Sequence, residues 1–253
     1  MGRLRAITRL VLFAIVSIYF FCLLLRNVAL GIKDMQSALR IRHRWGKACI
    51  KVLGIKVELL SPVPQGTHLY LANHRNYIDA ALMIKFVCGT IVAKAEVEKW
   101  PVIGPGSRAS HVIFIDRKSK DSRMETRLAI KEHLSQGSPV IIFPEGTTHK
   151  APGVGLLRPG PFQIAYDGGF SVVPVAIEYE DVDDAWVGDD TFPRHFMQCF
   201  SKKRVALKIK FGDPFIVTDP ETDCERTYQW MQESTLAMRA AYDGRVTTMV
   251  TSN

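Results

Sequence analysis

The sequence THLYLANHRNYIDAALMIKFV, residues 67–87, joins an apolar run to a polar segment and then to a second apolar run. Residues 67–72 are predicted to form a strand and residues 79–87 a helix. His74 and Asp79, five positions apart, would point to different faces of a helix, because each residue turns it by about 100°. The two side chains can meet only if the strand ends at the histidine and the helix begins before the aspartate.

Short β-like runs alternate with helical patterns from residue 55 onward. Strands are predicted at 55–59, 67–72, 90–94, 111–116, 138–144 and 170–180, with two more within 204–217, and helices at 79–87, 119–137, 160–169 and 222–243. This alternation predicts an α/β fold with a mostly parallel, twisted sheet flanked by helices. Pro174 indicates that its strand lies at a sheet edge or that the strand enters the sheet there.

The first fifty residues carry the excess positive charge of the chain. They contain nine Lys/Arg and one acidic residue, whereas the net charge of all 253 residues is +8, so the remainder is neutral. Arg3, Arg5 and Arg9 precede sixteen uncharged residues at 10–25. A helix of sixteen residues spans about 24 Å, less than the roughly 30 Å hydrocarbon core of a bilayer. We predict a membrane anchor, spanning or shallow; a cleaved signal peptide and a buried core helix are the alternatives.

Residues 32–54 predict a basic amphipathic helix. Basic residues surround its apolar positions, and Trp45 stands at the edge of the apolar stripe; the basic residues are Arg40, Arg42, Arg44 and Lys47. Such a helix suits an anionic membrane surface. The alternative is a helix docked on its own domain with a solvated basic face.

The chain is therefore divided into an N-terminal membrane-associated helical segment, residues 1–54, and an α/β domain, residues 55–253. No nucleic-acid partner is expected, because the basic cluster adjoins a lipid-like run and no aromatic and basic platform follows it. The five cysteines are scattered without metal-ligand spacing. Disulfides and structural zinc are not expected.

Three polar clusters follow predicted strands. NHRNYID (73–79), DR (116–117) and EGTTHK (145–150) each begin where an apolar run ends. Ligands of parallel α/β sheets bind beyond the carboxyl ends of the strands. We expect the three clusters to converge on one site.

The residue types in these clusters suit a general base beside an anion site. A carboxylate at Asp79 would orient His74, leaving the other imidazole nitrogen as a base; alternatively the segment is a solvated loop with an acid near a helix N-terminus. Arg117 suits phosphate or carboxylate, and Lys94 offers a second positive charge, although either could form a surface ion pair.

The third cluster, Glu145-Gly146-Thr147, supplies a carboxylate, a flexible glycine, a hydroxyl and backbone donors for a phosphate or an oxyanion, or it forms only a turn. The sequence contains no G-x-S-x-G, Walker A, H-E-x-x-H or G-x-G-x-x-G motif. Serine-hydrolase, nucleotide-binding and zinc-protease functions are therefore not supported.

Four blocks in this order resemble those of the glycerolipid acyltransferase family, typified by bacterial lysophosphatidic acid acyltransferases. They are NHRNYID, VIFIDR (112–117), FPEGT (143–147) and VVPVAI (172–177), and AKAEVEKWPVIG (93–104) is similar to a further segment. The resemblance covers roughly residues 45–215. It implies transfer of a fatty acyl group from acyl carrier protein or coenzyme A to the hydroxyl of a lysolipid, such as lysophosphatidic acid, without a metal or another cofactor.

The resemblance also implies a role for each matched residue. His74 would be the general base and Asp79 its orienting carboxylate. Arg117, with Lys94, would bind the phosphate of the acceptor. The remaining members of the implied substrate site, which would shape the acceptor and oxyanion region, are Asn73, Glu145, Gly146 and Thr147.

One departure leaves the acceptor open. Many members that form phosphatidic acid carry arginine after the E-G-T triplet, whereas Thr148 and His149 stand here. A lyso-aminolipid, such as a lyso-ornithine or lyso-glycine lipid, is the alternative acceptor. A membrane-associated lipid hydrolase and a non-catalytic lipid-binding protein are further alternatives. The positive N-terminus predicts an active site on the cytoplasmic face of the inner membrane.

Overall fold

The computed structural model describes residues 1–32, 34–100, 103–188 and 190–250. A single eight-stranded sheet forms its centre, in the order β1-β7-β6-β2-β5-β3-β4, with β8 paired to β6. Five of the seven strand pairings are parallel, which confirms the predicted mostly parallel sheet. The strands are β1 (Ile55–Leu59), β2 (Leu69–Ala72), β3 (Thr90–Lys94), β4 (Ile113–Ile115), β5 (Val140–Ile142), β6 (Ser171–Tyr179), β7 (Val205–Phe211) and β8 (Phe215–Ile216).

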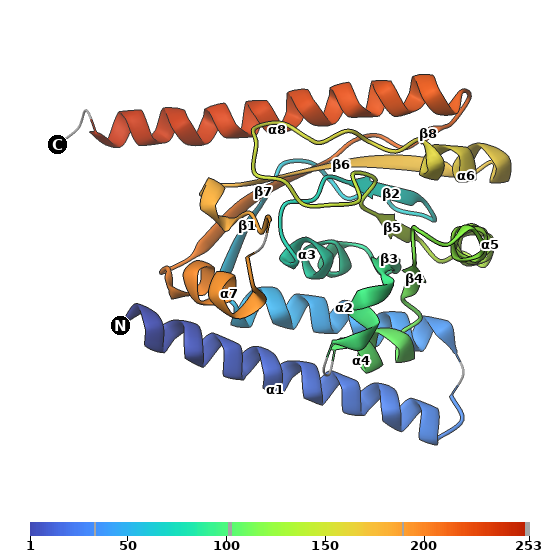
Figure 1. Cartoon of the computed structure of the whole chain (residues 1–253), viewed down its shortest axis with the longest axis horizontal. Coiled ribbons are helices and arrows are strands. Elements are labelled where there is room, and N and C mark those ends of the chain that lie inside the picture. The colour runs from blue at the N-terminus through green and yellow to red at the C-terminus, as the bar shows by residue number, and fades with distance from the viewer. Residues whose placement is uncertain (33, 101–102, 189, 251–253) are drawn as a thin grey trace.

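Helices cover both faces of this sheet, as the alternating pattern predicts. In Figure 1, α8 and α6 lie above the sheet, and α1, α2 and α3 lie below it. The α-helices are α1 (Gly2–Ala29), α2 (Met35–Val52), α3 (Ile78–Phe86), α4 (Ile103–Ala109), α5 (Lys120–Ser135), α6 (Gly160–Gly168), α7 (Phe192–Ser201) and α8 (Pro220–Val250); the 3₁₀ helices are η1 (Ala95–Lys99) and η2 (Val182–Asp184). The sequence did not predict α4 or α7.

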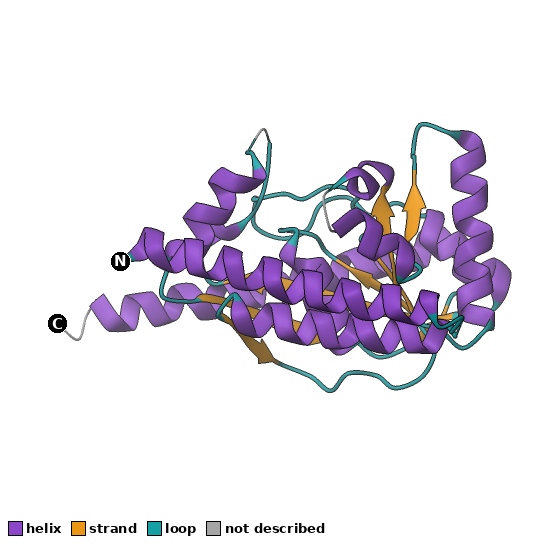
Figure 2. Cartoon of the chain, turned by 90° about the horizontal axis from the view of Figure 1, so that it is seen from below, coloured by secondary structure: helices purple, strands orange, loops and turns teal. Residues whose placement is uncertain are grey.

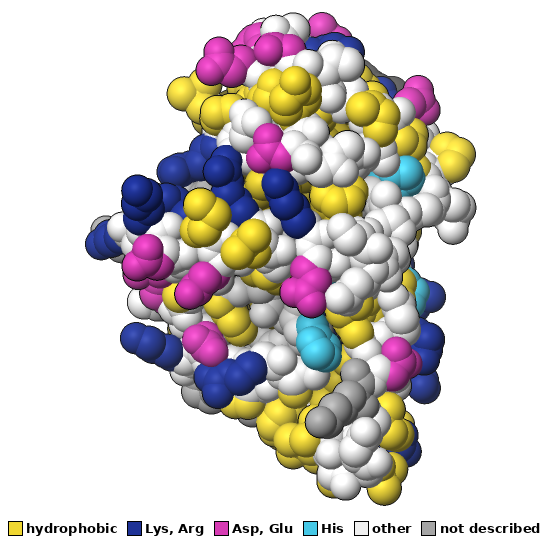
Figure 3. Space-filling view, turned by 90° about the vertical axis from the view of Figure 1, so that its right-hand side faces the viewer, with side chains coloured by type: hydrophobic (Ala, Val, Ile, Leu, Met, Phe, Trp, Pro, Cys, Tyr) yellow, Lys and Arg dark blue, Asp and Glu magenta, His cyan; other side chains and the backbone are white. Residues whose placement is uncertain are grey.

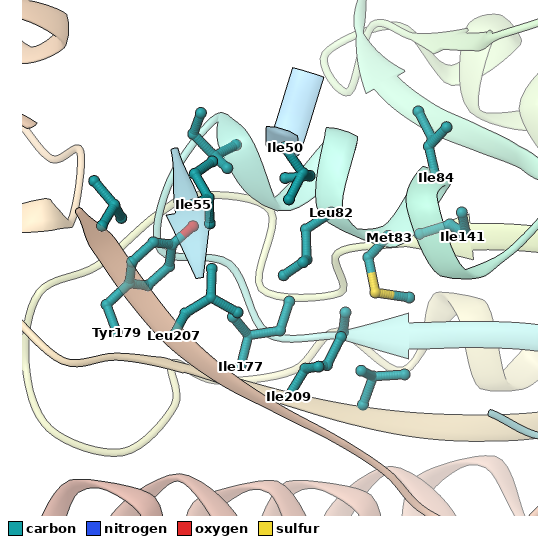
Figure 4. Packing of buried hydrophobic residues seen from close by; sticks show 14 of the residues in the cluster. Ile50, Ile55, Leu82, Met83, Ile84, Ile141, Ile177, Tyr179, Leu207 and Ile209 are labelled. Carbon is teal, nitrogen blue, oxygen red and sulfur yellow. The ribbon is translucent and has the colours of Figure 1, made fainter. Parts of the chain in front are cut away.

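The main core lies between the lower face of the sheet and α3. Leu82 and Met83 of α3 approach Ile177 of β6 and Ile209 of β7 (Figure 4), and all four side chains are buried. Because both α3 and the central strands are enclosed, their sequences read as nearly unbroken apolar runs. Gly46 of α2 allows the close approach of α2 to α3, since a Cβ there would lie only 2.9 Å from the carbonyl oxygen of Ala81.

The expectation that Pro174 marks a sheet edge or a strand entry is wrong. Pro174 lies in the middle of β6, which pairs with β2 on one side and with both β7 and β8 on the other. On the second side, β8 pairs with residues up to Val172 and β7 pairs from Val175 onward. The residue that lacks an N–H donor therefore falls where one neighbouring strand ends and the other begins.

The central residues of α2 face the domain, in contrast to the predicted basic surface. Arg42 is only 4% exposed, and its Nη1 donates to the carbonyl oxygen of Ser110 at 2.9 Å. Trp45 donates from Nε1 to the hydroxyl of Ser17 at 3.2 Å and packs near Phe13 of α1. Helix α2 thus docks on its own domain, while binding of its exposed residues Arg40, Arg44 and Lys47 to a membrane stays a prediction.

The long apolar helix α1 lies against α2 and α7 (Figures 1 and 2). Arg5 donates to the carbonyl oxygen of Ser201 at 2.8 Å, and Arg9 donates to those of Phe200 at 3.0 Å and Lys202 at 2.9 Å. These contacts satisfy carbonyl groups at the C-terminus of α7, which have no partner within their own helix. The apolar segment is thereby fastened to the domain. The division at residue 54 stays a prediction.

Candidate active site

The chain turns between His74 and Asp79, as their pairing requires. Strand β2 ends at Ala72 and helix α3 begins at Ile78, which places Asp79 in the first turn of the helix. His74 Nδ1 lies 3.0 Å from Asp79 Oδ2. The expected geometry of the pair is present.

The Asp79 carboxylate is completely buried and is surrounded by hydrogen-bond donors. Its Oδ2 also accepts from the backbone N–H groups of Arg75 at 2.6 Å and Asn76 at 2.8 Å. Its Oδ1 accepts from the hydroxyl of Tyr179 at 2.6 Å. Burial first, and then the Asp79 charge, raise the pKa of Tyr179 well above its usual value, so this hydroxyl keeps its proton. In the neutral imidazole, a carboxylate that only accepts favours the tautomer of His74 with its proton on Nδ1, in which Nε2 is the acceptor.

The ring of His74 is held flat against Phe143 at the end of β5. The two ring centroids are 4.2 Å apart and the planes differ by 16°. The side chain of His74 is 22% exposed, whereas that of Asp79 is fully buried. The ring is thus fixed by packing on one side and a carboxylate on the other, while part of it stays accessible to a substrate.

Glu145 connects three segments of the site. Its Oε2 accepts from the backbone N–H of His74 at 2.5 Å, and its Oε1 accepts from the backbone N–H of Gly155 at 2.6 Å. The Nε2 of His149 lies 2.8 Å from the same Oε1. Both carboxylate oxygens are engaged inside the protein, and the side chain is only 2% exposed. The groups that engage both oxygens belong to the protein itself, and the assignment of Glu145 to the substrate site stays a prediction.

Arg117 reaches the turn that follows Glu145. Its Nη1 donates to the carbonyl oxygen of Gly146, which has a φ of +75° and so adopts a conformation that favours glycine. Thr147 is exposed beside this turn, and the N–H of Gly146 is occupied by the carbonyl oxygen of Phe143 at 3.1 Å. Clusters two and three therefore meet, as expected.

Comparison with known proteins agrees with this arrangement. A family model described as Acyltransferase matches residues 54–178, which include all three clusters. A lyso-ornithine lipid O-acyltransferase of Pseudomonas aeruginosa is 32% identical over 181 residues, which cover 69% of each chain. The chain belongs to the acyltransferase family.

Two further similarities extend this finding. A 1-acyl-sn-glycerol-3-phosphate acyltransferase of Neisseria gonorrhoeae is 28% identical over 173 residues, covering 66% of this chain and 68% of the relative. The crystal structure of the 1-acyl-sn-glycerophosphate acyltransferase of Thermotoga maritima superposes with a TM-score of 0.71 at 20% identity and covers 95% of this chain and 98% of that one. The resemblance based on the four sequence blocks is confirmed, and so is the predicted fold.

Among the described residues of this acyltransferase, the side chains of Asn73 and Lys94 form no hydrogen bond to His74 or Asp79. The side chain of Asn73 is buried and pairs with the backbone of Ile177, donating at 2.9 Å and accepting at 2.7 Å. It joins β2 to β6, and its place in the substrate site stays a prediction. Lys94 is exposed at the carboxyl end of β3, in register with Ile115, and so lies on the same sheet edge as Arg117.

The sequence did not point to Arg75 as a structural residue of the acyltransferase. Arg75 is buried, and its Nη2 donates to Glu178 at 2.6 Å while its Nη1 donates to the carbonyl oxygen of Ala151 at 2.8 Å. It ties the histidine segment to the loop after Thr147. In the sequence, Arg75 is marked only by its position within the segment NHRNYID. Among the described residues, no group of three or more His, Cys, Asp or Glu is arranged to hold a metal ion.

Proposed function

We propose that this acyltransferase moves a fatty acyl group from an acyl thioester to the hydroxyl of a lysolipid, with lysophosphatidic acid as acceptor and phosphatidic acid as product. The observation that carries the proposal is the buried Asp79 carboxylate held 3.0 Å from a partly exposed His74. Relatives named for acyl transfer to lysolipids support the substrate class.

In the proposed reaction, His74 Nε2 removes the proton of the acceptor hydroxyl as its oxygen attacks the thioester carbonyl. The imidazolium that forms is stabilised by Asp79. The tetrahedral intermediate then collapses, the carbon–sulfur bond breaks, and the thiol leaves with the proton held by His74. The product is an ester, and neither a covalent acyl-enzyme nor a cofactor is required. Among the described residues, no serine or cysteine forms a hydrogen bond to His74, which supports direct attack by the acceptor.

Lyso-ornithine lipid is the second candidate acceptor. The relative from Pseudomonas aeruginosa is named for this acceptor, and a relative of the same name from Brucella abortus is 23% identical over 218 residues. Thr148 stands where many phosphatidic-acid-forming members carry arginine. The donor is proposed to be acyl carrier protein or coenzyme A carrying the acyl group.

The test is acceptor-dependent thiol release by the purified full-length protein. Each donor is assayed with lysophosphatidic acid, with lyso-ornithine lipid and without acceptor. Wild type should release thiol only with an acceptor and form the diacyl product, and His74→Ala should lower kcat about 10²- to 10⁴-fold. His68→Ala, at the other end of β2, is the matched control. Thiol release without acceptor would identify a hydrolase. Full activity of His74→Ala would refute the proposed mechanism.

We also propose that α1 attaches the enzyme to the membrane by lying in its surface. α1 is the single helix among the described residues that is long and apolar enough to span a bilayer, yet it rests on the domain. A stripe at helical spacing faces outward and remains exposed; it consists of Leu4, Ile7, Val11, Ile15, Ile18 and Leu25. An apolar stripe of this kind inserts into the headgroup boundary of one leaflet.

Flotation with lipid vesicles tests this attachment. The double variant Ile15→Glu/Ile18→Glu should remain in the soluble fraction, whereas Leu236→Glu, at an exposed apolar position on α8, should float like wild type. Equal flotation of all three proteins would refute the proposal. The cytoplasmic face is proposed from the positive N-terminus, and protection of the domain from protease in vesicles with exposed cytoplasmic faces would contradict it.

A further inference from the structure

Two arginines from distant parts of the sequence meet at Gly146. Arg117 donates to its carbonyl oxygen, and a Cβ built on Gly146 would clash with the same guanidinium and lie 3.3 Å from Arg158 Nε. The backbone N–H of Arg158 donates to the carbonyl oxygen of Pro144 at 3.1 Å. The chain therefore returns to the P-E-G-T turn and brings a second guanidinium to it.

The two charges stand together without a neutralising acid. Among the described residues, neither Arg117 nor Arg158 has a carboxylate oxygen within 4.0 Å. Burial first and the charge of Arg158 second lower the pKa of Arg117, and the more distant Glu96 opposes them. Like charges held close destabilise each other unless an anion lies between them. A pair of arginines in this state is a typical site for an anionic ligand.

We propose that Arg158 is a further ligand of the anionic headgroup of the acceptor, a phosphate monoester or a carboxylate, and that it acts beside Arg117, for which the family resemblance already implies this role. This inference rests on the proposed function. Arg158 then supplies the second guanidinium that Thr148 does not provide after the E-G-T triplet. On the side of the molecule that carries α5 and α6, many Lys and Arg side chains gather toward one edge, with Asp and Glu side chains among and below them (Figure 3).

Glu145 and Gly146 link the arginine pair to the base. Gly146, which both arginines reach, directly follows Glu145, whose carboxylate accepts from the backbone N–H of His74 at 2.5 Å. In lysophosphatidic acid the free hydroxyl and the phosphate ester stand on neighbouring glycerol carbons when the acyl chain occupies the outer position. A headgroup held at Arg117 and Arg158 would leave that hydroxyl beside His74.

Acceptor kinetics of full-length Arg158→Gln, with one acyl donor, test the inference. The acceptors are lysophosphatidic acid, lyso-ornithine lipid and monoacylglycerol, which has no headgroup charge. For the anionic acceptor that wild type uses, KM should rise roughly tenfold to a hundredfold, the effect of losing one charge-assisted hydrogen bond. Arg158→Lys should recover part of this loss. Arg194→Gln, whose side chain is 81% exposed on α7, is the control and should match wild type.

The outcomes separate this inference from the proposed function. A raised KM for lysophosphatidic acid identifies a phosphate ligand, and a raised KM for lyso-ornithine lipid identifies a carboxylate ligand; either supports the site. An unchanged KM for every anionic acceptor, or an equal rise for monoacylglycerol, would overturn it. Wild type without transfer to any lysolipid would instead refute the proposed function. Thermal unfolding of Arg158→Gln at the wild-type temperature excludes a folding defect.

Discussion

Replacing Asp79 with asparagine removes one charge from the site while keeping its shape. The amide oxygen can accept from the backbone N–H groups of Arg75 and Asn76, as Oδ2 does now, while the amide nitrogen faces the hydroxyl of Tyr179. The rotatable hydroxyl can then accept in place of donating. The variant should fold, and the hydrogen bond to His74 Nδ1 should persist.

The magnitude follows from the 3.0 Å separation of His74 Nδ1 and Asp79 Oδ2. Unit charges at this separation attract by about 5 kcal/mol at an effective dielectric constant of about 20. His74 is partly solvated, which reduces the attraction to about 3 to 4 kcal/mol. The attraction exists only once His74 is protonated in the transition state, so it lowers the barrier without strengthening substrate binding. At about 1.4 kcal/mol per factor of ten, kcat should fall about 10²- to 10³-fold at constant KM.

The assay is steady-state acyl transfer with the preferred acceptor, together with thermal unfolding. Asp167→Asn is the control, because Asp167 is an exposed acid on α6 paired with Lys131 at 3.4 Å. A folded Asp79→Asn enzyme with less than about threefold loss of kcat would refute the proposal that Asp79 stabilises an imidazolium. A loss carried mainly by KM would refute it too.

Two further predictions concern the turn and the stability of the domain. Gly146→Ala should raise the acceptor KM, because the new methyl group would displace Arg117. It should also lower Tm by about 2 to 8 °C, since an alanine in the left-handed conformation costs about 1–2 kcal/mol. Gly160→Ala is the control and should change neither value, because a Cβ at Gly160 would have no neighbour within 4 Å. Burial, with the charges of His111 and Arg42, lowers the pKa of His133. Below about pH 6.5, the unfolded chain therefore binds more protons at His133 than the folded protein does. As far as His133 is concerned, the folded protein keeps its full stability above about pH 6.5 and loses part of it as the pH falls. His133→Leu should shrink the decrease in Tm between about pH 7.5 and 5.5; an unchanged decrease would contradict this.

The sheet was predictable because its strands are nearly continuous apolar runs. The turn between His74 and Asp79 followed from the end of one such run and the start of the next. The convergence of Arg117 with Gly146 followed from the rule that carboxyl ends of parallel strands share one edge. These features depend on local pattern and on general topology, both of which the sequence displays.

The features that were missed depend on partners far along the chain. From the sequence, Arg42 resembles a solvated residue of a basic helix. In the structure its guanidinium donates to the carbonyl oxygen of Ser110, which is distant in sequence. Arg158 stands outside every motif and reaches the site only because the loop after Thr147 folds back on Pro144. Glu145 has the residue type of a ligand, and only its burial reveals that it holds the backbone. Side-chain partners of this kind cannot be read from periodicity.

The three-way contact of Glu145 has a consequence for how acceptor preference can diverge. Its carboxylate accepts from the backbone N–H groups of His74 and Gly155, and among the described residues neither Arg117 nor Arg158 donates to it. Substitutions at the two arginine positions can therefore change the proposed headgroup contacts while the base keeps its place. If the proposed headgroup site is correct, a single scaffold can give rise to enzymes for phosphate-bearing and amino-acid-bearing lipids through changes at these positions.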